Sequence, residues 1–202
     1  MGEAEKLVKA LFQVAKEVAP SLIFLDEVDA LLSSRKSDGE HEASRRLKTE
    51  FMVQMEGIGS GENRVLVLAC TNCPWDVDSA VLRRFPRRIF VPLPDAAARD
   101  ALLKNLLAKA GKHSIKKKAQ RAELVRRLEG FSCSDITAIA SEASFGPIRS
   151  LGGLAAVKGA KEKDVRPVND GDFEEAIRKA TKSVSETHLR KFETWRHEQS
   201  AS

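Results

Sequence analysis

The pattern of hydrophobic and polar residues divides the chain into two parts. In the first part, helical spacing of apolar residues over residues 3–18 and 43–56 alternates with short, continuous apolar runs at residues 22–25, 65–69 and 89–91. Such runs are typical of strands that are covered on both faces, and their alternation with helices is typical of a parallel sheet. The first part is therefore predicted to be α/β, with a doubly wound parallel sheet.

Past Pro94 the apolar runs stop and only helical spacing continues. Asp95 can cap the first of these helices, and Gly111 follows its last residue, Ala110. We place a domain boundary near Pro94, with an α/β part over residues 1–94 and a small helical domain over residues 95–202. The helices expected in the second part cover residues 96–110, 119–129, 134–145, 172–181 and 185–198.

Composition narrows the class of protein. The hydrophobic fraction is 42%, which is ordinary for a globular protein, and no apolar stretch approaches the roughly 20 residues of a membrane span. Three cysteines without a secretory signal favour a reducing compartment. The net charge of +5 suits either an acidic partner or an ordinary solvated surface. The only tight basic run, residues 116–118, is too short to indicate a binding site, and we expect no nucleic-acid partner and no membrane span.

The most informative residues follow the first apolar run. Asp26 and Glu27 come directly after Leu25, and paired acids at the tip of a buried strand are costly unless they meet a cation or a substrate. In phosphoryl-transfer enzymes the first acid of such a pair holds Mg²⁺ and the next polarises the attacking water. The alternative is a helix cap, with Asp26 or Asp29 opening the following helix.

Two further elements bear on that choice. Asn72 follows the second apolar run, at the same edge of the predicted sheet, where an amide could orient water or touch a γ-phosphate. Arg83 and Arg84 come next, and arginine neutralises transferring phosphates. The alternatives are a turn-forming Asn before Pro74 and a basic helix face. Two adjacent strands that deliver polar groups to one edge favour the functional interpretation.

Together these stretches resemble the AAA+ group of spastin, fidgetin and katanin, and the related vacuolar-sorting ATPases that disassemble ESCRT filaments. The resemblance covers nearly the whole chain, and the motifs that carry it are residues 25–29 (LDEVD), 39–50 (GEHEASRRLKTE), 71–72 (TN) and 82–85 (LRRF). It implies an ATPase that uses ATP and Mg²⁺ and works as a homo-hexamer with nucleotide between subunits.

The resemblance also implies roles for particular residues. Asp26 would coordinate Mg²⁺ through water, Glu27 would activate water, and Asn72 matches the sensor-1 position. Arg83 and Arg84 match the arginine fingers, which act on ATP bound by the neighbouring subunit. The resemblance implies two further sets of residues. A second pore loop, which touches the threaded substrate, is matched by Gly39, Glu40, His41 and Glu42. A contact near the adenine is matched by Ser132 and Cys133.

The resemblance leaves two classes of substrate open. Residues 146–151, 165–167 and 183–185 are similar to the microtubule-severing members, which pull acidic tubulin tails through the hexamer pore. Residues 72–75 (NCPW) are similar to the vacuolar-sorting members, whose substrates are ESCRT filament subunits. We favour severing, and with it a cytoplasmic, cytoskeleton-associated protein.

Departures from the family pattern matter as much as the matches. The sequence holds no Gly-x-x-x-x-Gly-Lys-Ser/Thr phosphate-binding loop, which in the family precedes residue 1 together with the first two strands. We therefore expect a fragment or a truncated gene model of an ATPase that is inactive by itself, or else a non-catalytic interaction module. Cys133 stands where the family usually has Gly. Cys70 and Cys73 form a lone CxxC that cannot complete a zinc site, and we interpret Cys70 as a core residue at a strand end.

Overall fold

The computed structural model describes residues 2–33, 42–58, 64–153 and 158–200. The chain divides into two compact units, Met1–Ile89 and Phe90–Ser202, which are described separately. The first contains a parallel sheet of two strands with helices, and the second contains helices, so the expected α/β part is followed by a helical part. Among the described residues, no helix combines the length and the apolar character needed to cross a membrane.

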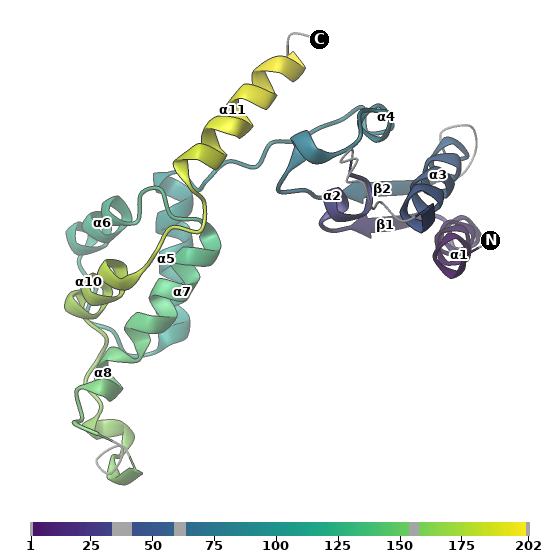
Figure 1. The fold of residues 1–202 in the computed structure, drawn as a ribbon. Coiled ribbons are helices and arrows are strands. Elements are labelled where there is room, and N and C mark those ends of the chain that lie inside the picture. Colours follow the sequence, from purple (N-terminus) through teal and green to yellow (C-terminus); the bar gives the residue numbers. More distant parts are fainter. Residues whose placement is uncertain (1, 34–41, 59–63, 154–157, 201–202) are drawn as a thin grey trace. The chain divides into compact units, whose positions relative to one another are not determined.

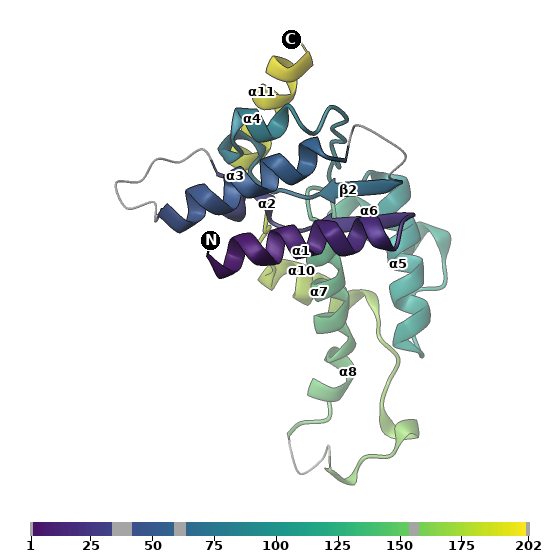
Figure 2. The same ribbon diagram turned by 90° about the vertical axis from the view of Figure 1, so that its right-hand side faces the viewer.

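The first unit is built around the two strands. Its elements are α1 (Glu3–Glu17), β1 (Ser21–Leu25), α2 (Val28–Leu31), α3 (Glu42–Glu56), β2 (Val65–Ala69), the 3₁₀ turn η1 (Pro74–Asp76) and α4 (Ser79–Leu82). The strands pair in parallel, from Ser21 opposite Val65 to Leu25 opposite Ala69. Helices α1 and α3 lie side by side next to the strands (Figures 1 and 2).

The core of this unit lies on one face of the sheet. Phe12 of α1 and Phe51 of α3 meet edge to face, with ring centroids 5.5 Å apart, and Ile23 of β1 is buried beside them. Aromatic pairs of this geometry stabilise a core beyond the area they bury. The buried members of the cluster are Phe12, Ala15, Ile23, Val28, Leu32, Phe51, Val77 and Val81.

The opposite face of the sheet is open, which corrects the prediction of strands covered on both faces. Leu22 and Phe24 of β1 are 57% and 56% exposed, and Leu66 and Leu68 of β2 are exposed as well. Within the described ranges, the helices of this unit bury only the face that holds Ile23. The strands therefore carry apolar side chains on a face that no described helix of this unit covers.

The third predicted strand, residues 89–91, does not form. This segment has no regular secondary structure, and Ile89 and Val91 are 85% and 82% exposed. A strand needs a neighbour to pair its backbone N–H and C=O groups, and the sheet of the described residues ends at β1 and β2. The apolar composition of residues 89–91 does not by itself show whether a neighbouring strand is present.

The second unit is a bundle of helices, and the five helices predicted there are confirmed. They are α5 (Ala96–Ala110), α6 (Lys118–Arg127), α7 (Cys133–Ser144), α10 (Asp170–Lys179) and α11 (Glu186–Ser200); the short α8 (Gly146–Arg149) and the 3₁₀ turn η2 (Glu162–Asp164) were not foreseen. The core is formed by α5, α6, α7 and α10, with Leu103, Leu124, Ile136 and Phe173 at its centre (Figure 1).

Phe90 begins the second unit, a few residues before Pro94, because it packs on α11. Its ring centroid lies 5.8 Å from that of Phe192, and the Arg196 guanidinium stands 5.6 Å from the Phe90 centroid. Aromatic stacking and cation–π attraction are both favourable at these distances. These contacts tie the start of the unit to its last helix.

An ion pair fixes the segment that leads into α10. Asp172 is 5% exposed, and its carboxylate accepts two hydrogen bonds from Arg166, at 2.6 and 2.7 Å, and one from the Asn169 backbone N–H at 2.9 Å. The Arg166 guanidinium is the main reason that the pKa of Asp172 lies below its ordinary value, and burial opposes this shift. The carboxylate therefore stays ionised inside the unit.

Gly146 is the residue that leaves room for this ion pair. A Cβ atom at Gly146 would lie 3.0 Å from the Cβ of Asp172 and closer still to its carboxylate. We therefore expect Gly146→Ala to lower the free energy of unfolding by about 1–3 kcal/mol, because Asp172 is held by Arg166 and cannot retreat. Chemical denaturation of the whole chain measures the change. Gly159→Ala is the matched control, since a Cβ there meets nothing within 4 Å, and equal unfolding midpoints for the two variants would contradict the close contact.

Candidate functional site

The candidate site lies where both strands end. Leu25 and Ala69 form the last pair of the parallel ladder, so Asp26–Glu27 and Cys70–Asn72 leave the sheet at the same edge. The two segments stay tied beyond the strands: the Cys70 N–H donates to the Leu25 carbonyl at 2.8 Å, and the Val28 N–H donates to the Cys70 carbonyl at 3.0 Å. Polar groups of both segments are thereby held together on one backbone frame.

The acid pair is exposed and has an unusual backbone. Glu27 has φ 50° and ψ 45°, a left-handed conformation that costs a non-glycine residue about 1–3 kcal/mol. Its N–H donates to the Asp26 Oδ1 at 2.9 Å. Glu27 occupies the N-cap of α2 but makes no side-chain capping bond, and Asp29 bonds to another loop. The helix-cap alternative therefore does not explain these acids, and strained residues of this kind cluster at functional sites.

Asp29 and Thr71 join the two segments and were missed as a pair in the sequence. The Thr71 hydroxyl donates to Asp29 Oδ1, and it also accepts from the Cys73 N–H at 3.0 Å. Asn72, which lies between Thr71 and Cys73 in the loop, is exposed. A hydroxyl residue two positions after the second strand, together with an acid four positions after the first, is the sequence signal that could have identified this link. The link fixes the loop that carries Asn72.

Arg83 and Arg84 follow α4 and are both exposed. Arg84 forms an ion pair with Glu56 at the end of α3. Arg88 donates from its guanidinium to the carbonyls of Leu82 and Phe85, at 3.2 Å each, and so closes the turn that carries the two arginines. Within the described part of the chain, the Arg83 side chain has no hydrogen-bond partner, and this leaves it able to bind a group outside its own unit.

Ser132 and Cys133 lie in the second unit, at the start of α7. Ser132 caps this helix: its hydroxyl accepts from the Asp135 N–H at 3.1 Å, and its own N–H donates to Asp135 at 3.0 Å. Burial disfavours the ionised form of Asp135, but hydrogen bonds from Ser132 and Ser183 outweigh it and hold its pKa below the ordinary value. Cys133 is exposed beside this cap. The role of Ser132 and Cys133 near an adenine stays a prediction.

Three of the four pore-loop residues, Gly39, Glu40 and His41, lie outside the described residues. Glu42 opens α3 and forms an ion pair with Arg46 one turn later. The pore-loop assignment therefore stays a prediction as a whole.

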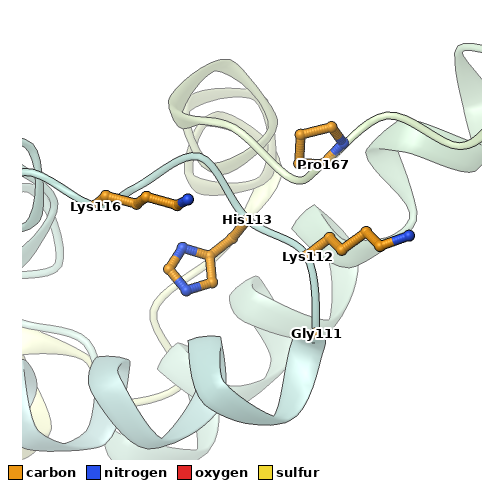
Figure 3. Close-up of a pocket in the computed structure, with 5 residues that line it drawn as sticks. All are labelled: Gly111, Lys112, His113, Lys116 and Pro167. Carbon is orange, nitrogen blue, oxygen red and sulfur yellow. The ribbon is translucent and has the colours of Figure 1, made fainter.

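A depression in the second unit does not belong to this set of residues. It has a volume of about 380 Å³ and is lined by Gly111, Lys112, His113, Lys116 and Pro167, from the loop after α5 and the segment before α10 (Figure 3). It contains none of the residues predicted to bind nucleotide. The candidate site is therefore an exposed sheet edge and not this depression.

The cysteines are free thiols, and one of them corrects the sequence interpretation. Cys70 is exposed, so it is not a core residue; the open sheet face and the loop after β2 leave it uncovered. Cys73 is partly exposed. Over the described residues there is no group of three or more His, Cys, Asp or Glu side chains that could hold a metal ion by themselves.

Comparison with known proteins extends these observations. Residues 1–93 match the model of the ATPase family associated with various cellular activities (AAA). Spastin of Homo sapiens is 48% identical over 196 residues, which cover 96% of this chain and 31% of that protein, and spastin of Gallus gallus is 47% identical over the same shares. The chain thus spans about a third of the length of these curated relatives.

Solved structures agree with the sequence match. The FIGL-1 AAA domain superposes with a TM-score of 0.87 at 38% identity, over 98% of this chain and 63% of that one. A structure from a study of katanin self-assembly superposes with a TM-score of 0.74 at 37% identity, over 95% of this chain and 63% of that one. With its parallel strands, its acid pair at their carboxyl edge and its helical second unit, this chain belongs to the AAA ATPases, in the group of spastin, fidgetin and katanin.

Proposed function

We propose that this chain forms part of an ATP-hydrolysing remodelling enzyme, with the sheet edge at Asp26, Glu27 and Asn72 as its hydrolytic centre. The observation that carries the proposal is the convergence of an acid pair and an amide at the ends of two paired strands, fixed by backbone hydrogen bonds past the last ladder pair. The carboxyl edge of a parallel sheet is where open α/β folds bind ligands. The family match and the similarity to a FIGL-1 AAA domain in complex with ADP support a nucleotide as the ligand.

The donor set fits Mg²⁺ bound together with nucleotide. Mg²⁺ takes oxygen ligands and is usually held by one or two carboxylates plus substrate phosphates. An exposed acid pair that belongs to no larger group of His, Cys, Asp or Glu among the described residues matches this. Asp26 would hold the ion through water, and the ion would neutralise phosphate charge. Glu27 would accept a proton from the attacking water, and Asn72 would orient that water.

Arg83 and Arg84 act, in this proposal, on nucleotide bound by a neighbouring copy of the chain. Both are exposed, and arginine stabilises the charge that develops on a transferring phosphoryl group. The similarity to a structure from a study of katanin self-assembly supports an assembly of several copies, and we infer a homo-hexamer.

The substrate that we propose is an acidic protein tail, as in microtubule severing. The net charge of +5 is compatible with an acidic partner, and spastins are among the relatives, at 46–48% identity. Association with the cytoskeleton follows from that substrate. An ESCRT filament subunit is the competing substrate, and stimulation of ATP hydrolysis by microtubules or by ESCRT filaments separates the two.

The first prediction is that residues 1–202 by themselves do not bind ATP tightly. Phosphate binding in P-loop enzymes rests on the backbone N–H groups and the lysine of the Gly-x-x-x-x-Gly-Lys-Ser/Thr loop, and this sequence contains none. Titration with a fluorescent ATP analogue measures the affinity. Micromolar binding by the purified chain would refute the prediction.

The next prediction needs a protein with a whole AAA domain. A suitable one is a chimaera in which the part of human spastin that precedes its match to this chain is joined to residues 3–202. In this chimaera, Glu27→Gln should keep ATP binding and lose most hydrolysis, because an amide fills the same space but is a poor base. ATP turnover and nucleotide affinity are measured in parallel. Hydrolysis within about threefold of the parent would exclude the role of general base.

Arg83→Ala in the same chimaera should lower ATP hydrolysis by about 10³- to 10⁵-fold and leave the affinity of its own nucleotide pocket unchanged. Mixing it with the Glu27→Gln chimaera should restore activity, because some interfaces then pair an intact Glu27 with an intact Arg83 from the neighbour. The measurement is ATPase rate against mixing ratio at fixed total protein.

A curve with its maximum at intermediate ratios supports a site shared between subunits. If the arginine served its own subunit, no subunit in the mixture would have both groups, and the rate would stay at background at every ratio. Capture of mixed oligomers through a tag on one variant is the control for subunit exchange. Dilution of each variant with the unsubstituted chimaera is the control for concerted hydrolysis around the ring.

A further inference from the structure

The segment that carries Arg83 is short and depends on the contacts at its ends. Helix α4 has only four residues, Ser79–Leu82, which is far below the length at which a helix is stable by itself. Val81 anchors it in the core of the first unit. Its first turn is capped by Asp78, whose Oδ1 accepts from the Ala80 N–H at 2.9 Å. The place of Arg83 therefore depends on where Asp78 is held.

Lys48 of α3 holds the other oxygen of that carboxylate. Its ammonium group donates to Asp78 Oδ2 at 2.9 Å and to the Ser33 carbonyl at 3.1 Å. The two side chains are only 21% and 26% exposed, so solvent competes weakly for this ion pair. Because one oxygen of Asp78 caps α4 and the other binds Lys48, the carboxylate cannot turn without losing one of the two bonds.

The backbone around Asp78 is fixed by the same neighbours. The Asp78 N–H donates to the Leu32 carbonyl at 3.0 Å, and Ser33 and Val77 form an isolated antiparallel bridge. The hydrogen bond from Lys48 is the largest cause, ahead of the Ala80 N–H, of a pKa of Asp78 below its ordinary value. The carboxylate is therefore ionised at neutral pH, and its charge is matched by Lys48.

Lys48 extends from a long helix that packs in the core of the unit. Helix α3 runs for 15 residues and packs on α1 through Phe51 and Phe12. A side chain on such a helix is a rigid support, whereas α4 itself is not. Phosphate-binding arginines must be placed to within a fraction of an ångström, and a displacement of 1 Å can cost about a hundredfold in rate.

We propose that Lys48 is a positioning residue for Arg83: by holding Asp78 it sets the place of α4, and thereby the reach of the arginine toward nucleotide on a neighbouring subunit. This inference rests on the proposed function. Lys48 does not touch nucleotide in this proposal, and it acts through the ion pair and the helix cap. A competing account is that Lys48 contributes only to the stability of the fold.

The experiment replaces Lys48 with methionine, which keeps the length of the side chain and removes the charge, in the chimaera defined above. ATP hydrolysis should fall by about tenfold to a hundredfold, while nucleotide affinity stays within about twofold. Mixing Lys48→Met with Glu27→Gln should restore activity at intermediate ratios, because Lys48→Met keeps a sound pocket and lacks only a well-placed arginine. Lys48→Arg, which keeps the charge, should retain most activity. Lys9→Met, at an exposed site on α1, is the matched control and should leave the rate unchanged.

The mixing assay separates the possible outcomes. Unchanged activity of Lys48→Met overturns the proposal. Loss of activity without rescue by Glu27→Gln also overturns it, provided that Arg83→Ala is rescued in the same assay, because Lys48 would then serve its own pocket or the fold. If Arg83→Ala is not rescued either, the shared site of the proposed function fails, and this inference fails with it.

A second variant covers the case in which Lys48→Met does not fold. Asp78→Asn keeps an oxygen to cap α4 and turns an amide N–H₂ toward the Lys48 ammonium, so it weakens the pairing with less change in packing. It should show the same loss of hydrolysis and the same rescue by Glu27→Gln. A folded Asp78→Asn variant with the parent's ATPase rate would overturn the proposal.

Discussion

The parallel pairing of β1 with β2 is the interaction on which the candidate site depends. In a parallel pair both carboxyl ends reach the same edge, and the ladder is extended past Leu25 by the Cys70 N–H and the Val28 N–H. One backbone frame thus carries Asp26 and Glu27 on one segment and Asn72 on the other. A shift of one strand by one residue would turn its side chains to the opposite face of the sheet and would break the hydrogen bonds that join the two segments past the ladder. The ladder therefore determines which polar side chains lie together at the edge.

The acid pair and the segment that carries Arg83 are held in place in different ways. Glu27 is placed by its own backbone, in a left-handed conformation that the N–H bond to Asp26 and the following Val28 N–H bond help to maintain. Arg83 follows a four-residue helix that is too short to be stable by itself; Asp78 caps this helix, and Lys48 of α3 binds Asp78. In the proposed function, Glu27 acts in the pocket of its own subunit and Arg83 acts in that of a neighbouring subunit.

The roles of Asp26, Glu27 and Asn72 are proposals, but their shared place in the fold was predictable. Sequence reasoning put them at one edge of the sheet because they follow closely after two apolar runs, and parallel strands end at one edge. It failed where a residue's role depends on a distant partner: the Thr71–Asp29 bond, the Lys48–Asp78 pair and the fit of Gly146 against Asp172 leave no periodic signal. The strand expected at residues 89–91 failed for the same reason, since a strand exists only through its neighbour.

The arrangement around Arg83 combines a fixed backbone with a guanidinium that attracts Asp78 electrostatically but makes no side-chain hydrogen bond in the described part of the chain. Arg88 binds the carbonyls of Leu82 and Phe85 on one side of the arginine, and Asp78 caps the helix on the other. Arg84 is held by Glu56, whereas Arg83 has no hydrogen-bond partner within the described part of the chain. In the proposed function Arg83 binds a phosphate outside its own unit. A backbone that is already ordered before the phosphate arrives favours this binding, because its ordering then costs nothing further.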